Sequence, residues 1–343
     1  MKKITTLLGF ATLIYSLNSC SNKDLVHPDF DYQTVYFGSQ YPIRTVELGE
    51  DLNVDNSLDN EHKISIKATL GGTRNSSKDV NIDFVVEESL CNGLYFQASN
   101  TKVIPMPSNY YKLASNKITI PAGEILGGVE VQLTDDFFAD PKSIQNTYAI
   151  PLLMKNVNGA DSILSGAPAI TNPNRLVESN WTKKPLDYVI YVVKYVNPWH
   201  GNYLRRGVDA VTYEGTATPV NLVRRANFVE KDEVNSLKTK SMKEIVFPVI
   251  LKDKSGTNIT CNLLLTFNDD GTCDIASASN GVTANGKGKF IKRGDKNSWG
   301  NQDRDALYLD YQIKASQFTA QTKDTLVMRD RAVSPEYFQP LVQ

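Results

Sequence analysis

Residues 263–276 have the sequence LLLTFNDDGTCDIA, and they say more about the fold class than any other segment. Apolar residues at 263–267 form one candidate strand and residues 273–276 form a second, with NDDG at 268–271 between them. An Asp-Gly pair supplies the positive φ that a tight hairpin turn needs. With Asp270 and Gly271 as a two-residue turn, residue 269 pairs with 272 and residue 268 with 273. The segment therefore predicts an antiparallel hairpin.

The second half of the chain continues this pattern. Only one weak helical segment is predicted, at residues 231–237. Short apolar runs separated by turn residues predict a series of antiparallel strands, and about eight such strands with short loops favour an up-and-down barrel or a sandwich. The predicted strands lie at residues 188–196, 243–250, 259–267, 273–279, 282–292, 305–314 and 324–331.

The first half also has a β pattern. Apolar residues alternate with polar ones at 35–37, 64–68, 82–86 and 129–133, which is typical of strands with one buried face. A further strand is predicted at 117–120, and another at 148–154, where Pro151 favours a sheet edge. Several short strands joined by turns over about 130 residues predict a sandwich like the immunoglobulin fold, at residues 35–164.

Residues 165–187 interrupt the β pattern. They contain Pro168, Pro173 and Pro185 among several Asn and Ser residues, and they show no sustained periodicity. This composition predicts a linker between two domains, so that the second domain covers residues 188–343.

The amino terminus has the features of a bacterial export signal. Lys2 and Lys3 precede an apolar stretch at residues 4–17, and the small residue Ser19 precedes Cys20. A cysteine at the first mature position can be acylated, which anchors a protein to a membrane. We therefore expect residues 1–19 to be a lipoprotein signal peptide, Cys20 to be lipidated, and residues 20–34 to form a tether.

Composition limits the possible partners. Removal of 19 of the 343 residues leaves 324, enough for about two domains. The net charge is −1, from 37 basic and 38 acidic residues without a basic stripe, so we expect no nucleic-acid partner. After the signal no apolar run approaches the ~20 residues that a membrane-spanning helix needs, and the membrane is expected as a partner only through the lipid.

Three cysteines remain after Cys20, namely Cys91, Cys261 and Cys273. In the hairpin register given above, Cys261 lies opposite residue 280, which is too far from Cys273 for a disulfide. We expect these cysteines to be buried and unpaired. The three histidines and the cysteines show no zinc-site spacing, and no cofactor or metal site is predicted.

Several segments resemble a known family, the Bacteroidota surface lipoproteins. In the first half these are VYFGSQYPIRT (35–45), LGED (48–51), MPSNYY (106–111) and IPAGE (120–124). They resemble an N-terminal β-sandwich domain that also stands ahead of some family 18 endo-glycosidases. In the second half, WHGNY (199–203), SWGN (298–301) and DTLVMRDR (324–331) are similar to the lipocalin-like C-terminal domain that is often fused to it.

The resemblance implies an all-β protein with an N-terminal immunoglobulin-like β-sandwich and a C-terminal lipocalin-like antiparallel β-barrel. Such proteins are usually encoded near glycan-uptake systems. The Asp-x-x-Asp-x-Asp-x-Glu segment of family 18 hydrolases does not occur, and neither does Gly-x-Ser-x-Gly or a phosphate-binding loop. We therefore expect a protein without catalytic activity, although a carboxylate pair could still act as a glycosidase site.

The best candidates for a ligand site are residues in the loops of the C-terminal barrel. A sugar stacks an apolar face on a planar side chain, while its hydroxyls need polar groups nearby. Trp299 lies in a polar loop that suits binding as well as anchoring of the loop. Trp199 precedes a strand, where it could bind ligand or close the end of the barrel. The predicted site comprises Trp199, Trp299, Asn301, Asp303 and Arg304.

Together these features predict a lipid-anchored glycan-binding protein that helps to capture or take up a polysaccharide or host glycan. We expect it in the outer membrane facing the cell exterior, with the periplasmic face as the alternative, and outer-membrane uptake proteins as further partners. The alternative functions are a glycoside hydrolase with an unrecognised carboxylate pair and a structural or adhesin subunit.

Overall fold

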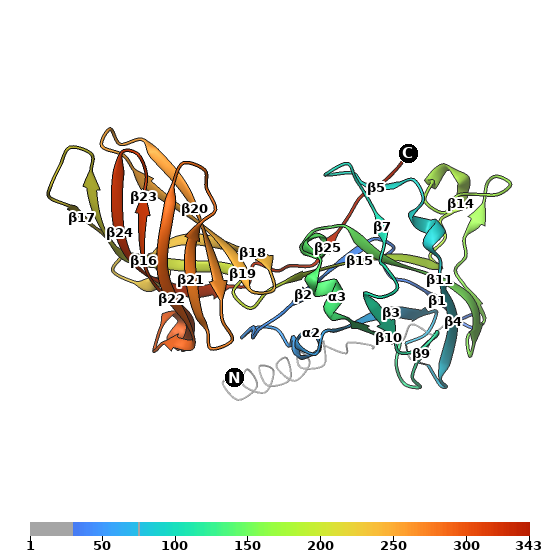
Figure 1. Cartoon of the computed structure of the whole chain (residues 1–343). Helices are drawn as coiled ribbons and strands as arrows, with labels where there is room; N and C mark the ends of the chain where they lie inside the picture. Colours follow the sequence, from blue (N-terminus) through green and yellow to red (C-terminus); the bar gives the residue numbers. More distant parts are fainter. Residues whose placement is uncertain (1–29, 75) are drawn as a thin grey trace, which may run out of the picture.

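The computed structural model describes residues 30–74 and 76–343, and it confirms an all-β protein (Figure 1). The predicted signal peptide and the predicted lipidation site, Cys20, lie outside the described residues. The strands form a large mixed sheet in the first half and a closed antiparallel barrel in the second. In the described ranges no helix is both long and apolar enough to cross a membrane.

The barrel is an up-and-down meander. Eight strands, β16 and β18 to β24, each pair with the next of the set, and β24 pairs back with β16 to close the barrel. The additional strand β17 pairs only with the second half of β16, beyond the part that pairs with β18. The strands are β16 (Gly201–Tyr213), β17 (Val220–Arg224), β18 (Glu233–Ser241), β19 (Glu244–Lys252), β20 (Asn258–Phe267), β21 (Thr272–Ser277), β22 (Thr283–Asp295), β23 (Arg304–Lys314) and β24 (Phe318–Asp330). The predicted helix at residues 231–237 is wrong, because β18 covers most of it.

The hairpin between β20 and β21 forms where the sequence predicts it, but its register differs by one residue. Phe267, not residue 268, lies opposite Cys273. The Gly271 amide donates to the Asn268 carbonyl at 3.0 Å, and Gly271 has a φ of 79°. This is a three-residue loop with a left-handed glycine, which adds one residue to the turn. Cys91, Cys261 and Cys273 are buried and free, which confirms that prediction.

The first half forms one continuous sheet in the order β12-β1-β3-β10-β9-β4-β11-β15-β2-β25, with β7 and β8 on its margins. It folds over on itself, because Ile66 near one end and Val193 near the other belong to the same buried cluster. Its strands are β1 (Thr34–Tyr36), β2 (Pro42–Glu47), β3 (Lys63–Gly71), β4 (Val80–Val86), β7 (Ile104–Pro105), β8 (Tyr111–Leu113), β9 (Lys117–Ile120), β10 (Leu126–Leu133), β11 (Tyr148–Asn158), β12 (Ser162–Ile163), β15 (Tyr188–Val196) and β25 (Glu336–Tyr337).

Short elements complete this half. They are the helices α2 (Ser57–Asn60) and α3 (Asp135–Ala139), the 3-10 helices η1 (Glu88–Cys91), η2 (Pro141–Ile144) and η3 (Glu178–Asn180), and the strands β5 (Leu94–Phe96), β6 (Thr101–Lys102), β13 (Ala167–Pro168), β14 (Trp181–Lys183) and β26 (Pro340–Val342). The barrel adds the 3-10 helices η4 (Val229–Lys231) and η5 (Trp299–Asn301).

Pro151 does not mark a sheet edge, because β11 lies between β4 and β15. The Pro151 carbonyl accepts the Glu87 amide at 2.9 Å, just beyond the end of β4. In an antiparallel strand the nitrogen and carbonyl of one residue face the same neighbour. The nitrogen of Pro151 therefore faces the end of β4, where the pairing of β11 with β4 stops. Its missing N–H removes no hydrogen bond between paired residues of the two strands.

The predicted domain boundaries differ from the observed arrangement. The pattern predicts that residues 188–196 open the second domain, whereas β15 pairs with β11 and β2 of the first. The expected linker at 165–187 lies against the same domain, since the amides of Phe37 and Met154 donate to the carbonyls of Leu186 and Asp187. An apolar strand alone does not indicate which sheet it joins.

After the barrel the chain returns to the first domain. We call residues 333–343 the C-terminal strap, which is the last segment in Figure 1 and runs from the barrel across the N-terminal sheet. In the strap β25 pairs with β2, and β26 pairs with β5. Phe338 lies in a second apolar cluster of the first domain, with Phe96 and Tyr188. The barrel is thus inserted in sequence between β15 and the strap, and the chain passes between the two domains twice, once before the barrel and once after it.

Candidate functional site

The structure brings four of the five predicted site residues together in the loop between β22 and β23. The Arg304 guanidinium lies 3.7 Å from the centre of the Trp299 ring, and Arg304 is only 7% exposed. Its Nε also donates to the Trp299 carbonyl at 3.4 Å. Asp303 accepts hydrogen bonds from Lys296 and from the Asn297 amide, which lower the pKa of its carboxyl, and Asn301 is exposed. One face of Trp299 is therefore covered by a side chain of its own loop.

Trp199 lies apart from that loop cluster, at the entrance to the barrel. Its ring stacks on Phe267 with centroids 3.9 Å apart and planes within 6°. The Tyr203 hydroxyl donates to the Trp199 carbonyl at 2.9 Å. These contacts join Trp199 to the barrel core, and Phe267 covers one face of its ring.

The inside of the barrel holds a network of charged side chains. Asp324 accepts from Arg205 and Tyr311 on one oxygen and from Arg224 on the other, at 2.7–3.0 Å. Arg224 also makes two bonds to Asp209. The Arg224 guanidinium reaches Asp324 beside Gly207. A Cβ at residue 207 would lie 2.3 Å from Asp324 Oδ1, so only glycine leaves room for this contact. Arg205 also lies 3.8 Å from Glu233, so two arginines face three carboxylates. The mutual pairing of these buried charges indicates a structural role.

A different group of residues forms the best-developed surface site, around Tyr337 on the strap. Phe338 packs edge-on against Tyr41 and Phe96, with ring centroids 5.3 and 5.0 Å away. Successive side chains of an extended segment point to opposite sides, so Tyr337 points outward and is 65% exposed. Tyr337 lines four hollows of the surface.

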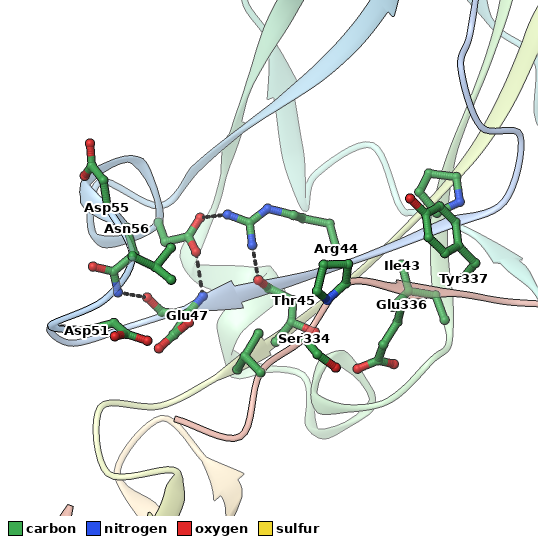
Figure 2. Close-up of a pocket in the computed structure, with 15 residues that line it drawn as sticks. Ile43, Arg44, Thr45, Glu47, Asp51, Asp55, Asn56, Ser334, Glu336 and Tyr337 are labelled. Carbon is green, nitrogen blue, oxygen red and sulfur yellow. Dashed lines mark hydrogen bonds and ion pairs between the residues drawn. The ribbon is translucent and has the colours of Figure 1, made fainter. Parts of the chain in front are cut away.

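The first hollow, which we call the junction pocket, lies where the strap leaves the barrel (Figure 2). It has a volume of about 360 Å³. Glu47 and Asp51 lie at one end and Glu336 and Tyr337 at the other, as Figure 2 shows. Its apolar walls come from Ile43, Val54, Val333 and Pro335.

Most charges in the junction pocket are already paired. Arg44 binds Asp59, and Lys194 binds Glu336 at 2.8 Å. Glu47 is 4% exposed and lies 3.5 Å from Arg331, and its burial, together with Asp51 and Asp59, raises its pKa from 4.5 to about 7. Within residues 30–74 and 76–343 no group of three or more His, Cys, Asp or Glu side chains is arranged to hold a metal ion.

The second hollow, the Trp181 hollow, lies on the other side of the strap and also has a volume of about 360 Å³. Tyr41 and Tyr188 share a hydrogen bond of 2.6 Å between their hydroxyls, and burial raises the pKa of both, so they remain protonated. Trp181 donates from Nε1 to the Asn174 carbonyl at 2.8 Å, which fixes its ring. The polar side chains around this hollow include Ser39, Gln40, Arg175, Glu178, Lys184 and Gln339.

The third, the Asn146 hollow, is larger, at about 670 Å³. Ile43, Phe96 and Phe338 form its buried apolar part, and Tyr337 stands at its margin. Asn146 Oδ1 is buried and has no hydrogen-bond partner among the described residues. The rim carries Gln97, Ser99, Glu336 and Gln339.

Sequence reasoning missed Trp181, Tyr337 and Asn146. Trp181 lies in the segment predicted as a linker, and Tyr337 follows the last predicted strand. A tryptophan in a Pro- and Asn-rich stretch was the one available signal, because a flexible linker has no need of a large apolar ring. Nothing in the local pattern around Asn146 indicates that it lines a hollow together with residues of the strap.

Two family models match the chain. Residues 198–332 match a domain of unknown function, DUF5627, and residues 30–161 match a model described as an N-terminal domain. These ranges correspond to the barrel and to most of the first domain. A comparison with curated proteins finds no match.

Solved structures extend the comparison. A Bacteroides ovatus protein of unknown function is 50% identical, with a TM-score of 0.87 over 92% of this chain and 100% of that chain. An auxiliary nutrient binding protein from Bacteroides thetaiotaomicron is 11% identical over 83% of this chain and 90% of that one, with a TM-score of 0.36. A Bacteroides ovatus protein provisionally described as carbohydrate binding is 13% identical over 90% and 99%, with a TM-score of 0.28. The last two scores are too low to carry an argument.

Proposed function

The chain belongs to the same family as the 50% identical Bacteroides ovatus protein, and from that premise we propose that it is a glycan-binding lipoprotein of the cell surface. Its glycan site is the surface around Tyr337, formed by the first domain and the C-terminal strap. The resemblance to surface lipoproteins encoded near glycan-uptake systems supports this role. The protein acts without catalysis and presents captured glycan to uptake proteins of the outer membrane.

One observation carries the proposal, namely the 65% exposed ring of Tyr337 between hollows of about 360 and 670 Å³. Volumes of this size suit small ligands. A flat exposed ring offers the apolar face of a sugar a stacking surface, and the Trp181 hollow places hydrogen-bonding side chains beside it. Trp299 and Trp199 are weaker platforms, because Arg304 and Phe267 each cover one of their faces.

A glycan array probed with the mature chain tests this function. Reproducible binding to a group of related glycans supports it, and a protein that binds no glycan but captures a partner protein would be a structural or adhesin subunit. Release of cleaved product from a bound glycan would instead identify a hydrolase. The array thus separates glycan binding from a structural or adhesin role, and the product assay separates binding from hydrolysis.

The location is tested separately. Metabolic labelling with a fatty-acid analogue should mark the wild-type protein and not Cys20→Ala. Protease treatment of intact cells should digest a protein that faces the exterior. An untouched protein would lie on the periplasmic side.

A further inference from the structure

A second aromatic ring lies beside Tyr337 in the Trp181 hollow. Trp181 is partly exposed, and both rings line this hollow of about 360 Å³. The hydrogen bond of 2.8 Å from Nε1 to the Asn174 carbonyl holds the Trp181 ring in place. The rings of Trp199 and Trp299 are each covered on one face, whereas no aromatic ring or cation of the described residues stacks on Trp181. A ligand in this hollow can therefore contact a second planar ring besides Tyr337.

The hollows on the two sides of the strap meet at Tyr337. The Trp181 hollow and the Asn146 hollow share three lining residues, Tyr337, Phe338 and Gln339. Their volumes are about 360 and 670 Å³, and each of them alone is in the range of a small-ligand pocket. One sugar ring on Tyr337 would leave most of this surface uncovered, whereas a chain of sugar units can extend from the ring into a hollow.

The charged side chains around the two hollows already have partners. The ion pairs are Arg175–Asp187, Lys184–Glu178 and Lys194–Glu336, with N–O distances of 2.7–3.0 Å. A charged sugar would compete with one of these pairs for its counter-charge. An uncharged sugar needs only a stacking surface and hydrogen bonds, and the exposed carboxamide of Gln339 offers both a donor and an acceptor.

We propose that the Tyr337 surface binds a chain of at least two uncharged sugar units, and that Trp181 is the platform for the second unit. One unit stacks on Tyr337, and the next lies in the Trp181 hollow against the indole ring. Because the two units are linked, the second contact is intramolecular and strengthens binding without any change in the first. The inference rests on the proposed glycan-binding function and names the class of glycan that the same site selects.

The test measures how affinity depends on chain length, by ligand-observed NMR titration of the mature chain. The uncharged probes are glucose with cellotetraose and maltotetraose, and mannose with mannotetraose. The charged probes are galacturonic acid and its tetramer. We expect at least one uncharged tetramer to bind at least tenfold more tightly than its monomer, and the galacturonic acid tetramer to bind more weakly than that tetramer.

A variant of Trp181 locates the second platform. Trp181→Ala should weaken binding of the preferred tetramer about tenfold and leave binding of the monomer unchanged, because the monomer stacks on Tyr337. The matched control is Phe228→Ala, which removes a 58% exposed ring from the barrel and should change neither affinity. Circular dichroism melting shows whether each variant is folded. Should Trp181→Ala fail to fold, Trp181→Leu provides the same test, because it keeps apolar volume and removes the planar ring.

The outcomes separate this inference from the proposed function. Equal affinity for monomer and tetramer, a length dependence that survives in the folded Trp181 variant, or tighter binding of the galacturonic acid tetramer overturns the inference while glycan binding stands. No binding of any probe overturns it as well, and the glycan array then decides on the proposed function by itself.

Discussion

The surroundings of the Glu47 side chain disfavour the ionised form of its carboxyl group. Burial, with help from Asp51 and Asp59, raises its pKa from 4.5 to about 7, although Arg331 opposes the shift. A carboxyl group with a raised pKa in the folded state contributes stability that is complete below pH 4.5 and is lost as the pH rises through 7. The junction between the domains is therefore expected to be weaker in mildly alkaline than in acidic solution.

Glu47→Gln tests this pH dependence. The neutral amide cannot ionise, so the variant should be more stable than the wild type at pH 8, by about 1–3 kcal/mol, and nearly equal to it at pH 4. Urea denaturation at both pH values measures the difference. Glu124→Gln, at an exposed turn, is the control and should change stability little at either pH. A variant that is less stable than the wild type at pH 8 would show that the ion pair with Arg331 matters more than the burial of charge.

Trp299 supports its own loop. Its contact with Arg304 is a stacked cation–π pair in which the arginine is buried. Trp299→Ala should lower the free energy of unfolding by about 1–3 kcal/mol, from the lost aromatic burial and the lost cation–π contact, and leave glycan affinity unchanged. Thermal melting and glycan titration of one preparation measure both effects. Lost affinity with unchanged melting would return the ligand site to this barrel loop.

Among the elements, the C-terminal strap belongs structurally to the first domain. Its β25 extends the main sheet next to β2, and Phe338 fills the second apolar cluster. Phe338→Ala should destabilise the first domain by about 3–5 kcal/mol, as expected for removal of a buried phenylalanine. Chemical denaturation followed by tryptophan fluorescence measures it, and Tyr337→Ala, its exposed neighbour, should cost much less. Equal stability of the two variants would mean that the strap is only loosely attached.

The elements also show what the sequence predicts well. The β pattern locates strands in both halves, since β4 in the first half and β19, β20 and β23 in the second lie within two residues of the predicted ranges. It does not fix pairing, so β15 was expected in the second domain and Pro151 at an edge. The one-residue shift at Gly271 depends on a left-handed backbone that the dipeptide Asp-Gly permits but does not require.

The site was less predictable than the fold. Loops of the barrel were favoured because they hold aromatic and polar residues close together in sequence. The surface at Tyr337 combines segments near residues 40, 97, 146, 181 and 337, and only tertiary pairing of the strap with β2 and β5 brings them together. Trp299 and Arg304 lie close together, as the sequence predicts, but Arg304 packs on the ring face that a ligand was expected to use.

At the scale of the whole molecule, Arg331 joins the two domains. It is 4% exposed and donates to the carbonyls of Leu48, Asn197 and His200 at 2.8–2.9 Å. Leu48 follows β2 of the first domain, whereas His200 leads into the barrel. One side chain thus satisfies acceptors on both sides of the junction, and this arrangement predicts that the domains unfold together.

Arg331→Ala should uncouple them. Removal of a buried charge with several partners is expected to cost about 3 kcal/mol or more, and the single calorimetric transition of the wild type should split into two. Arg329→Ala, whose side chain is half exposed, is the matched control and should keep one transition. A single transition in Arg331→Ala at an unchanged temperature would show that the junction is held by other contacts, such as those of Asn197.

The central claim is that the surface around Tyr337 binds glycan, and affinity for the best glycan from the array tests it most directly. Isothermal titration should show that Tyr337→Ala weakens binding about ten- to hundredfold, which corresponds to about 1.4–2.8 kcal/mol, while Tyr337→Phe keeps most of the affinity because the ring remains. Both variants should melt within a few degrees of the wild type, since the side chain is exposed. Unchanged affinity in folded Tyr337→Ala would contradict the claim.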